Sequence, residues 1–559
     1  MTITDAAADL LATGPVCDAC LGRPFADRSF GLRNDQRGRA LRTTLALERD
    51  EPYESVEPVD CWVCEGYCGT YDALAATVVD SLDGIAFGTY QLGTVVPPLT
   101  EENDRLLRED AGMDPEAGEP LNREVNREVG RRVGQETGAE FDLERPDVLC
   151  IVDLSAFDPH EVLIDDDGDD GDDRDAGIGG GSVTPHAVDR QINPAFVYGR
   201  YRKLDRDIPQ TEWPCRDCGG EGIQLGDDGE APCEHCGGSG YMYETSVEQV
   251  VRPHVVASME GRAGTFHGAG REDVDARMLG TGRPFVLEVE GPRTRDPDPA
   301  VLEGEINEAA DGAVEVEGLR LATYEMVERV KEHDASKRYR AAVRFGEPVS
   351  QAALDDALAA LDGATIEQYT PQRVDHRRAN LTRERTVYSI DGHLGVDEAM
   401  VGSGKVATLT DDVNAVAASD GEPDGTSNGK LGGEPVGTSN DEPDDEPEEA
   451  STATITIHGE GGLYVKELIS GDDGRTEPSV AGLLGSDAEV VALDVLEVTG
   501  EDEPFERPAY FRDGESVEDA SDEPAADDSD ERAGEEPDDG SADESAQDPS
   551  ADTAEVTDE

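Results

Sequence analysis

The stretch from His267 to Phe285 combines residue types that could do chemistry, because a charged core lies between two pairs of glycines. The core is Arg271, Glu272 and Asp273. Glycine has no Cβ, so such a loop can bring its backbone close to a ligand. A carboxylate beside a guanidinium is held ionised, ready to act as a nucleophile or a base. The stretch therefore predicts a reactive carboxylate, although a charged loop without any catalytic role has the same composition.

The elements that must position this loop show strand and helix periodicity. Residues 284–290 alternate like a strand, which would mount the loop on the edge of a rigid sheet. The same patterns predict further strands at 147–154, 161–164, 313–321, 338–345, 365–369, 386–393 and 453–458, and helices at 72–82, 122–137 and 351–361. We therefore expect an α/β (α+β) fold whose C-terminal part contains a mixed or antiparallel sheet.

The charge of the chain is strongly acidic throughout its length. The formal net charge is −81, of which residues 501–559 contribute −22, so the first 500 residues still carry −59. Only six of the 47 basic residues are lysine. An acidic surface in which arginine replaces lysine is typical of a protein that works in concentrated salt, where self-repulsion is screened. Because such salt also weakens attraction to phosphate, the acidity does not exclude a nucleic-acid partner, which would be bound through shape and local basic patches.

Eight of the ten cysteines form four Cys-x2-Cys pairs, a spacing that favours zinc over disulfides in a large chain. Two of these pairs are each followed by Gly-Gly-x-Gly, which frees backbone amides to turn toward thiolate sulfur. With four protein ligands, this site would be closed and structural. Its ligands would be Cys215, Cys218, Cys233 and Cys236.

The other two pairs predict a second zinc site near the N-terminus, with buried structural cysteines as the alternative. Its ligands would be Cys17, Cys20, Cys61 and Cys64. Cys68 is a substitute ligand or a spare thiol, and Cys150 lies in an apolar run typical of a core.

No run of 18 or more apolar residues occurs, and the first residues have neither a basic segment nor an apolar core. We therefore expect no membrane span, no secretion and a cytoplasmic location.

The motif around Asp273 closely resembles the catalytic motif of the archaeal and eukaryotic tRNA pseudouridine synthases that act on the TΨC loop, the family with an N-terminal THUMP domain. The resemblance extends over most of residues 14–499, apart from acidic inserts. In that family the aspartate after Gly-Arg-Glu is the nucleophile, which carries over to Asp273, with Asp275 as a rival. The resemblance implies that this chain isomerises uridine 54, uridine 55 or both in tRNA, without a catalytic cofactor. We expect tRNA as the partner, no small-molecule cofactor and a monomer.

Two further segments match motifs of the family. The first, Lys337 to Arg344, implies that Tyr339 stacks on the target base and later serves in proton transfer, whereas a strand tyrosine filling a core is the alternative. The second begins at Gly462 and implies that Tyr464 contacts the substrate.

The resemblance also implies the walls and charges of the pocket. Val465 and Leu493 would be apolar walls, although family members often carry isoleucine where Val465 stands. Lys466 would pair with phosphate or with Asp273. Arg271 is the expected ion partner of Asp273 and would flip the target base or fill its place.

Basic residues gather in two places. Arg200, Arg202 and Lys203 lie among tyrosines, a mix that suits RNA, although a helix end with a solvated face is an equal rival. The second cluster provides five cations within 15 residues, with salt bridges to the acidic surface as the alternative to phosphate contacts. Its members are Arg373, Arg377, Arg378, Arg383 and Arg385.

Composition and resemblance together predict five regions. They are a cysteine-pair segment (1–70), a THUMP-like RNA-binding domain (71–205) with an acidic insert (165–182), a four-cysteine knuckle (206–245), a pseudouridine synthase domain (246–500) with a low-complexity insert (402–450), and a disordered acidic tail (501–559).

Two other functions compete with this interpretation. Another THUMP enzyme, a methyltransferase or a thiouridylase, would need a methionine-cofactor loop or a pyrophosphatase loop, and the sequence contains neither motif. A zinc-binding RNA adaptor or chaperone without catalysis is suggested by the cysteine repeats, which resemble the module of DnaJ-type chaperones. Such a chaperone would need more repeats than one site's worth.

Overall fold

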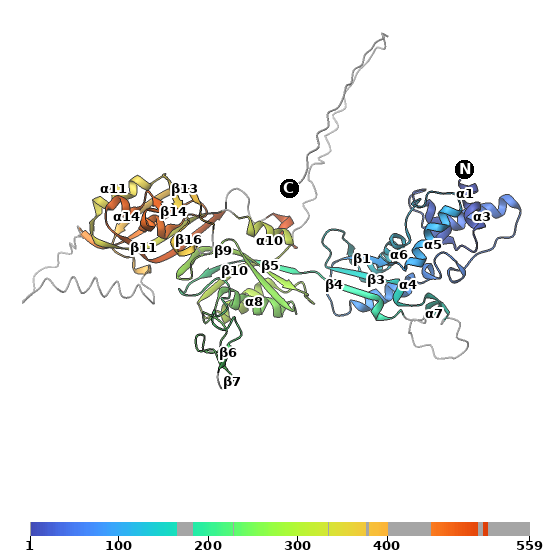
Figure 1. Ribbon diagram of the computed structural model, residues 1–559, viewed down its shortest axis with the longest axis horizontal. Coiled ribbons are helices and arrows are strands. Elements are labelled where there is room, and N and C mark those ends of the chain that lie inside the picture. The colour runs from blue at the N-terminus through green and yellow to red at the C-terminus, as the bar shows by residue number, and fades with distance from the viewer. Residues whose placement is uncertain are drawn as a thin grey trace, which may run out of the picture. The chain divides into compact units, whose positions relative to one another are not determined.

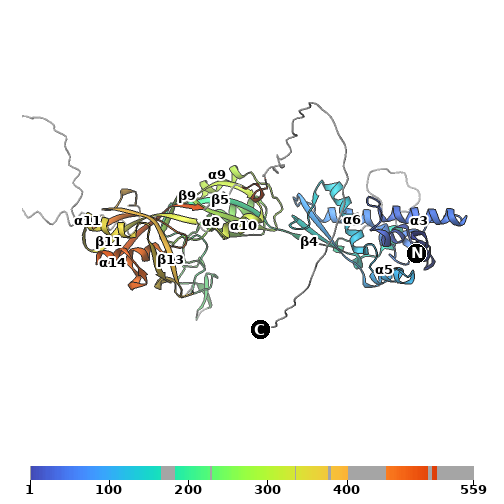
Figure 2. The ribbon, with the colours of Figure 1, turned by 90° about the horizontal axis from the view of Figure 1, so that it is seen from above.

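The computed structural model describes residues 2–164, 183–226, 229–333, 335–375, 379–400, 449–500 and 507–512 (Figures 1 and 2). The acidic insert 165–182, nearly all of the insert 402–450, most of the tail, and the predicted RNA contacts Arg377 and Arg378 lie outside these residues. The described residues form three sheets, of four, ten and two strands. The four-stranded sheet is called the small sheet below, and the ten-stranded sheet is called the large sheet. None of the described helices is both long and apolar enough to cross a membrane.

Within the described residues, the N-terminal part begins with four α-helices, and the strands of the small sheet then alternate with three more. Its helices are α1 (Ile3–Ala12), α2 (Asp18–Gly22), α3 (Asn34–Arg49), α4 (Tyr71–Ser81), α5 (Pro98–Asp110), α6 (Leu121–Thr137) and α7 (Pro159–Ile164). The strands follow the order β2-β1-β3-β4 and are β1 (Thr89–Val95), β2 (Glu140–Phe141), β3 (Val148–Asp153) and β4 (Val188–Ile192). Helix α6 buries Leu121, Val125, Val129 and Val133 at four-residue spacing, so one apolar face joins the core.

Two helices and a strand of this part confirm the periodicity, and one prediction is wrong. The helices expected at 72–82 and 122–137 are α4 and α6, and the strand at 147–154 is β3, where Cys150 is buried as expected. The strand expected at 161–164 is instead the end of α7. Asp158 accepts a hydrogen bond from the amide of His160, and Pro159 occupies the first helical position, so the local sequence starts a helix.

The large sheet follows the order β10-β5-β9-β16-β11-β14-β13-β12-β15, and β8 also pairs with β9. The strands of its first half are β5 (Ala195–Lys203), β8 (Ala263–Gly268), β9 (Ala276–Glu290), β10 (Val314–Ala322) and β16 (Ala488–Gly500). Those of the second half are β11 (Ala335–Ser350), β12 (Thr365–Tyr369), β13 (Thr382–Leu394), β14 (Glu449–Gly459) and β15 (Thr476–Glu477). Every pair is antiparallel except β16 with β9, so the sheet is mixed, as expected.

Helices cover both faces of the large sheet. They are α8 (Val247–Ser258), α9 (Pro299–Ala309), α10 (Tyr324–Lys331), α11 (Gln351–Leu361), α13 (Val465–Ser470) and α14 (Val480–Leu484). Strand β9 shows why: Phe285 and Leu287 pack in the main core with α8 and α9, whereas Val286 packs with α10 on the other face. A strand buried on both faces has a continuous apolar run, which explains Phe-Val-Leu at 285–287.

Strand β9 changes its neighbour along its length, and this change creates the loop of interest. Its C-terminal half pairs with β8, whereas Ala276 and Met278 at its start pair in parallel with β16. The loop 269–275 leaves β8 at this point and enters β9. The strand begins earlier than the sequence predicted, and Gly280 and Gly282 form a bulge inside it, where both have positive φ.

The bulge gives a stability prediction. A Cβ at Gly280 would lie 1.8 Å from the carbonyl oxygen of Leu496, and its φ is +57°. We expect Gly280→Ala to lower the free energy of unfolding by more than about 3 kcal/mol. Gly318 in β10 is a matched control, because its φ is +67° and nothing lies within 4 Å. Gly318→Ala should cost only about 1 kcal/mol, and equal losses in denaturant titrations of the two variants would contradict the packing argument.

Candidate active site

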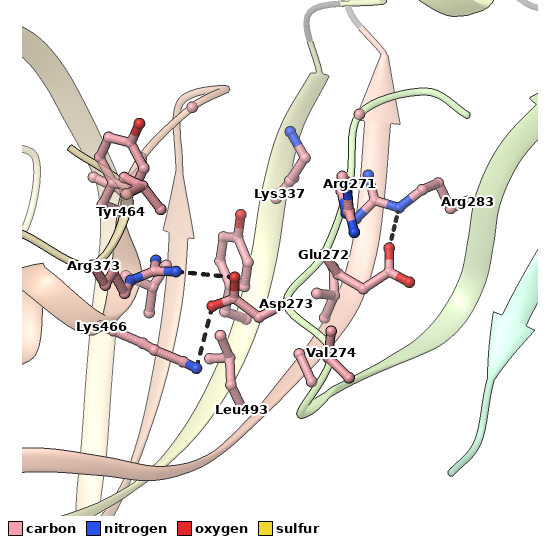
Figure 3. Close-up of a pocket in the computed structure, with 18 of the residues that line it drawn as sticks. Arg271, Glu272, Asp273, Val274, Arg283, Lys337, Arg373, Tyr464, Lys466 and Leu493 are labelled. Atoms are coloured by element: carbon pink, nitrogen blue, oxygen red, sulfur yellow. Dashed lines mark hydrogen bonds and ion pairs between the residues drawn. The ribbon is translucent and has the colours of Figure 1, made fainter. Parts of the chain in front are cut away.

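The residues singled out around Asp273 line one cleft of about 600 Å³ (Figure 3). The loop 269–275, β11, the start of α13 and β16 each contribute to it. The structure thus brings together residues separated by more than 200 positions. The predicted site residues in the lining are Arg271, Asp273, Tyr339, Arg373, Tyr464, Val465, Lys466 and Leu493.

The Asp273 carboxylate lies between two cations. Arg373 Nη1 is 3.0 Å from Oδ1, and Lys466 Nζ is 3.2 Å from Oδ2. Burial raises the pKa of Asp273, but Arg373 and Lys466 outweigh it, so the pKa of this carboxyl lies below its ordinary value. Its side chain is 34% exposed, so an ionised carboxylate remains accessible from the cleft.

The ion partner expected for Asp273 was wrong. Arg271 does not turn toward the carboxylate two residues ahead; its guanidinium lies over the Trp213 ring, 5.0 Å from the centroid. Arg373 comes from another part of the chain and takes the place at Asp273, with its Nη1 at 3.0 Å from the carboxylate. The alternative expected for Lys466, a pair with Asp273, is confirmed, and Lys466 also contacts Asp275 at 2.9 Å.

Glu272, between Arg271 and Asp273, anchors the loop to the core. Its buried carboxylate accepts hydrogen bonds from Arg283 Nε at 2.8 Å and from the Tyr201 hydroxyl at 2.8 Å. Burying a carboxylate is costly unless it is paired and hydrogen-bonded, as it is here. Because Glu272 points inward, its neighbour Asp273 is directed into the cleft (Figure 3). A lone glutamate in a charged loop gives no sequence signal of this role.

Lys203, predicted to bind RNA, is fully buried and cannot contact RNA in this structure. Its Nζ donates hydrogen bonds to the carbonyls of Ile208, Asp273 and Val274 at 2.7, 3.2 and 3.0 Å. Burial lowers the pKa of Lys203 to about 8. The reason is strand alternation: residues 201 and 203 of β5 share the inner face. Lys203 therefore supports the loop 269–275.

The other two basic residues of this cluster are on strand β5, so the helix-end alternative is wrong. Arg200 Nε donates to the Thr281 carbonyl at 2.7 Å. Arg202 pairs with Glu315 and Glu317 at 3.1 and 2.8 Å. Both side chains are half-buried and bind within the chain, which favours a structural role. RNA binding by Arg200 and Arg202 stays a prediction.

Two tyrosines and two aliphatic side chains line the cleft beside Asp273. Tyr339 is 9% exposed, and burial raises the pKa of its hydroxyl to about 12, so it stays protonated. Val465 and Leu493 are buried walls. The backbone of Tyr464 is held by the buried side chain of Gln368, which accepts from its amide at 2.9 Å and donates to its carbonyl at 3.0 Å.

Behind Leu493, a buried carboxylate ties four segments together. Asp494 is 0% exposed and pairs with Arg277 of β9 at 2.7 Å, with Arg206 at 2.8 Å and with Arg340 of β11 at 3.3 Å. These contacts fix the parallel junction of β9 and β16 from which the loop 269–275 projects. Sequence reasoning treated Leu493 alone as functional and missed its neighbour, because buried ion pairs leave no periodic pattern.

The four cysteines of the knuckle have the geometry of a zinc site. The knuckle contains the two-stranded sheet of β6 (Ile223–Gly226) and β7 (Gly229–Pro232). The Cys215–Cys233 and Cys218–Cys236 sulfurs are 3.9 and 3.8 Å apart. A tetrahedron with Zn–S bonds of about 2.3 Å has edges of about 3.8 Å. The amides of Gly222 and Gly240 donate to sulfur at 3.2 Å each, which confirms the expected turning of the amides.

The N-terminal cysteines also form a four-sulfur cluster, in which Cys61 is not a member and Cys68, expected as a substitute ligand or a spare thiol, is one. Cys17, Cys20, Cys64 and Cys68 have sulfurs within 4.8 Å of one another. Cys68 thus replaces Cys61, because the turn Tyr67–Gly69 brings its sulfur to 3.9 Å from that of Cys20. The guanidinium of the buried Arg23 donates to the Cys20 sulfur at 3.2 Å, which favours the thiolate that binds metal.

Chemically, the cleft holds an accessible carboxylate, a protonated phenol and apolar walls. Such a set can stack a flat, uncharged ring on Tyr339 while the carboxylate attacks or deprotonates a carbon of the group that carries the ring. Arg383 and Arg385, of the second basic cluster, contact Thr370 and Glu460 instead of lining the cleft.

Comparisons with known proteins give matches over most of the chain. The family model described as Pus10, C-terminal, matches residues 196–402 and 444–499, and the model described as Pus10 THUMP domain, archaeal, matches residues 74–153. The chain is 52% identical over 513 residues to a protein named tRNA pseudouridine synthase Pus10 from Halorubrum lacusprofundi, covering 92% of this chain and all of that one.

More distant relatives carry the same name. The chain is 37% identical to the protein from Methanothrix thermoacetophila, covering 88% of this chain and 93% of the relative. It is 31% identical to the one from Pyrococcus furiosus, covering 89% and 98%. With both family models matched in order and a relative aligned over its full length, this chain belongs to the Pus10 family.

Proposed function

We propose that this chain is a tRNA pseudouridine synthase that isomerises uridine 54, uridine 55 or both in the TΨC loop. The observation that carries the proposal is the Asp273 carboxylate, held ionised in a cleft with Tyr339 and Tyr464. The name of the relatives supports the substrate class. Membership of a family of synthases favours an enzyme over a zinc-binding adaptor or chaperone.

The reaction needs a carboxylate, a surface on which the base can stack and the exclusion of water, and the cleft can supply all three. The bond from C1′ to N1 of uracil breaks and its electron pair stays on N1. The base rotates and C5 joins C1′. C5 then loses its proton while N1 gains one, so the product is an isomer of the substrate. Asp273 either attacks C1′ or removes the proton at C2′, and both routes start from an ionised carboxylate. Tyr339 stacks on the base while Val465 and Leu493 confine it, so that water does not intercept the freed uracil. The protonated Tyr339 then serves in proton transfer.

The target uridine is stacked inside folded tRNA and must be turned out to reach Asp273. Arg271 is exposed beside the cleft and is the residue that we assign to the space the base leaves. The region matched by the archaeal THUMP model, together with the remainder of residues 71–205, would bind the rest of the tRNA. We further propose that the five regions predicted from the sequence are the domains of the chain. We also propose that the enzyme is a monomer.

Replacing the carboxylate tests the nucleophile. We expect Asp273→Asn to lower kcat by about 10³-fold or more while tRNA binding is kept, because the amide neither attacks nor takes a proton. Tritium release from tRNA labelled at uridine C5 measures the rate. Asp275→Asn is the matched control, since Asp275 also contacts Lys466, and should stay within about fivefold of the unaltered chain. An active Asp273→Asn variant, or a dead Asp275→Asn variant, would overturn the assignment.

The pairing of Asp273 predicts a change in pH dependence. In this proposal activity needs the carboxylate ionised, and Arg373 and Lys466 lower the pKa of Asp273, so kcat/KM should begin to fall only at a pH below the range in which an ordinary aspartate titrates. Removing one cation raises this pKa. Lys466→Met should therefore move the acid limb of kcat/KM upward by about one pH unit. Arg385→Met removes a cation that pairs with Glu460 instead, and its limb should not move. An unmoved limb in Lys466→Met would contradict the pairing.

We infer that both cysteine clusters hold structural zinc. The purified chain should contain two zinc ions, one for each cluster. Cys68→Ser should lose one ion because it removes a ligand, whereas Cys61→Ser should keep both. Elemental analysis of the purified variants measures this, and loss of zinc in Cys61→Ser with retention in Cys68→Ser would show that the ligand set is the one the sequence suggested.

A further inference from the structure

The four-cysteine knuckle meets the catalytic domain through a short neck made of residues 210–214 and 241–243. Pro214 and Tyr241 form an antiparallel bridge, and the amide of Met242 donates to the Trp213 carbonyl at 2.9 Å. The amide of the ligand Cys215 donates to the Gly240 carbonyl at 2.7 Å. The metal ligands are therefore continuous with the neck. When the four cysteines are held in place, the two segments of the neck are held side by side as well.

The neck contacts the catalytic loop at two points. The Gln210 side chain donates to the Gly270 carbonyl at 3.0 Å, one residue before Arg271. The Trp213 ring then lies under the Arg271 guanidinium, at 5.0 Å. Trp213 itself lines the cleft with Asp273. Both the backbone and the side chain of the loop are thus held by the root of the knuckle.

Trp213 is fixed by its own neighbour across the neck. The Tyr243 ring meets the indole edge-on, with centroids 5.6 Å apart and planes at 79°. The indole face that Arg271 covers is therefore set by the neck. No hydrogen bond or ion pair holds the guanidinium of Arg271 within the described residues, so the indole is what selects among its many rotamers.

We propose that the knuckle is a metal-dependent positioning module: zinc orders the neck, the neck fixes Trp213, and Trp213 aims Arg271 at the RNA around the extruded uridine. The proposal rests on the proposed function, because it names how the same cleft holds its substrate. A guanidinium stacked on an indole keeps its other face and its N–H groups for a base or a phosphate. Trp213 is a positioning residue that acts through Arg271.

The test is a double-mutant cycle on Trp213 and Arg271, measured for the dissociation constant of an unmodified tRNA transcript and for kcat/KM. We expect Trp213→Ala to weaken each by about fivefold, and Trp213→Phe to restore most of the loss because it keeps an aromatic face. In the Arg271→Ala background, Trp213→Ala should add nothing. Losses that multiply in the double variant would overturn the proposal, because Trp213 would then act independently of Arg271.

A second readout follows the metal without activity. The chain has two tryptophans, so Trp62→Phe leaves Trp213 as the sole one. Introducing Cys236→Ser, which removes a ligand of the knuckle alone, should shift Trp213 emission to longer wavelength and weaken tRNA binding to the level of Trp213→Ala. Leu225→Ala at the exposed hairpin tip is the control and should change neither. If Trp213 emission and tRNA affinity stay unchanged when the metal site is lost, the knuckle does not position Trp213.

The two proposals fail in distinguishable ways. If the unaltered chain binds tRNA but forms no pseudouridine, the proposed function falls, whereas the binding cycle and the emission still decide the role of Trp213. If pseudouridine forms and the losses in tRNA affinity multiply in the double variant, the proposed function holds. The proposal that the knuckle positions Arg271 is then wrong.

Discussion

A carboxylate held between two cations is the interaction on which the site depends. The role proposed for Asp273 needs an ionised carboxylate, yet Asp273 lies in a partly closed cleft where burial works against the charge. Arg373 and Lys466 resolve this conflict at contact distances of 3.0 and 3.2 Å. Arg373 is in turn paired with Glu467 at 2.6 Å, and this pair holds its guanidinium at Asp273 when substrate enters or leaves the cleft.

The large sheet holds this arrangement through buried charge as well as through apolar packing. Strand β9 changes partner at the loop, and such a junction would be loose without further contacts. Glu272 on one side and Asp494 on the other hold it with buried ion pairs to Arg283 and Arg277. Breaking a buried pair leaves an uncompensated charge and is strongly destabilising. The loop can therefore be rich in glycine and still present Asp273 in one direction.

The charge of −81 and these pairs are compatible because they act over different distances. The Debye length is about 3 Å in 1 M salt, so attraction between distant charges and RNA is screened while groups in contact still interact. A protein that works in concentrated salt must therefore recognise RNA through direct contacts and not through long-range attraction. The proposed stacking on Tyr339 and close pairing at the cleft suit that requirement better than a broad basic surface does.

What the sequence predicted well was local. The knuckle at 215–236 follows from two short repeats, and its N–H···S bonds follow from the glycines after them. Helix α11 and strands β10 to β13 follow from periodicity. The grouping of Asp273 with Tyr339 and Tyr464 came from resemblance, because no local pattern links such distant residues.

The misses were contacts between distant parts of the chain. Arg373, 100 positions from Asp273, is its partner in place of Arg271, which is only two positions away. Cys68 replaced Cys61 because a turn, not the pair spacing, sets the sulfur positions. Lys203 was expected on the surface and is buried, since alternation along β5 turns it inward. Charge in a sequence shows that a group needs a partner, but the fold decides whether that partner is RNA or protein.

The most direct measurement of the central claim is carbodiimide mapping of an unmodified tRNA transcript after incubation with the chain in molar salt. The account predicts reverse-transcription stops that mark pseudouridine at position 54, position 55 or both. A transcript that is bound by the chain and yet shows no pseudouridine in its TΨC loop would contradict it.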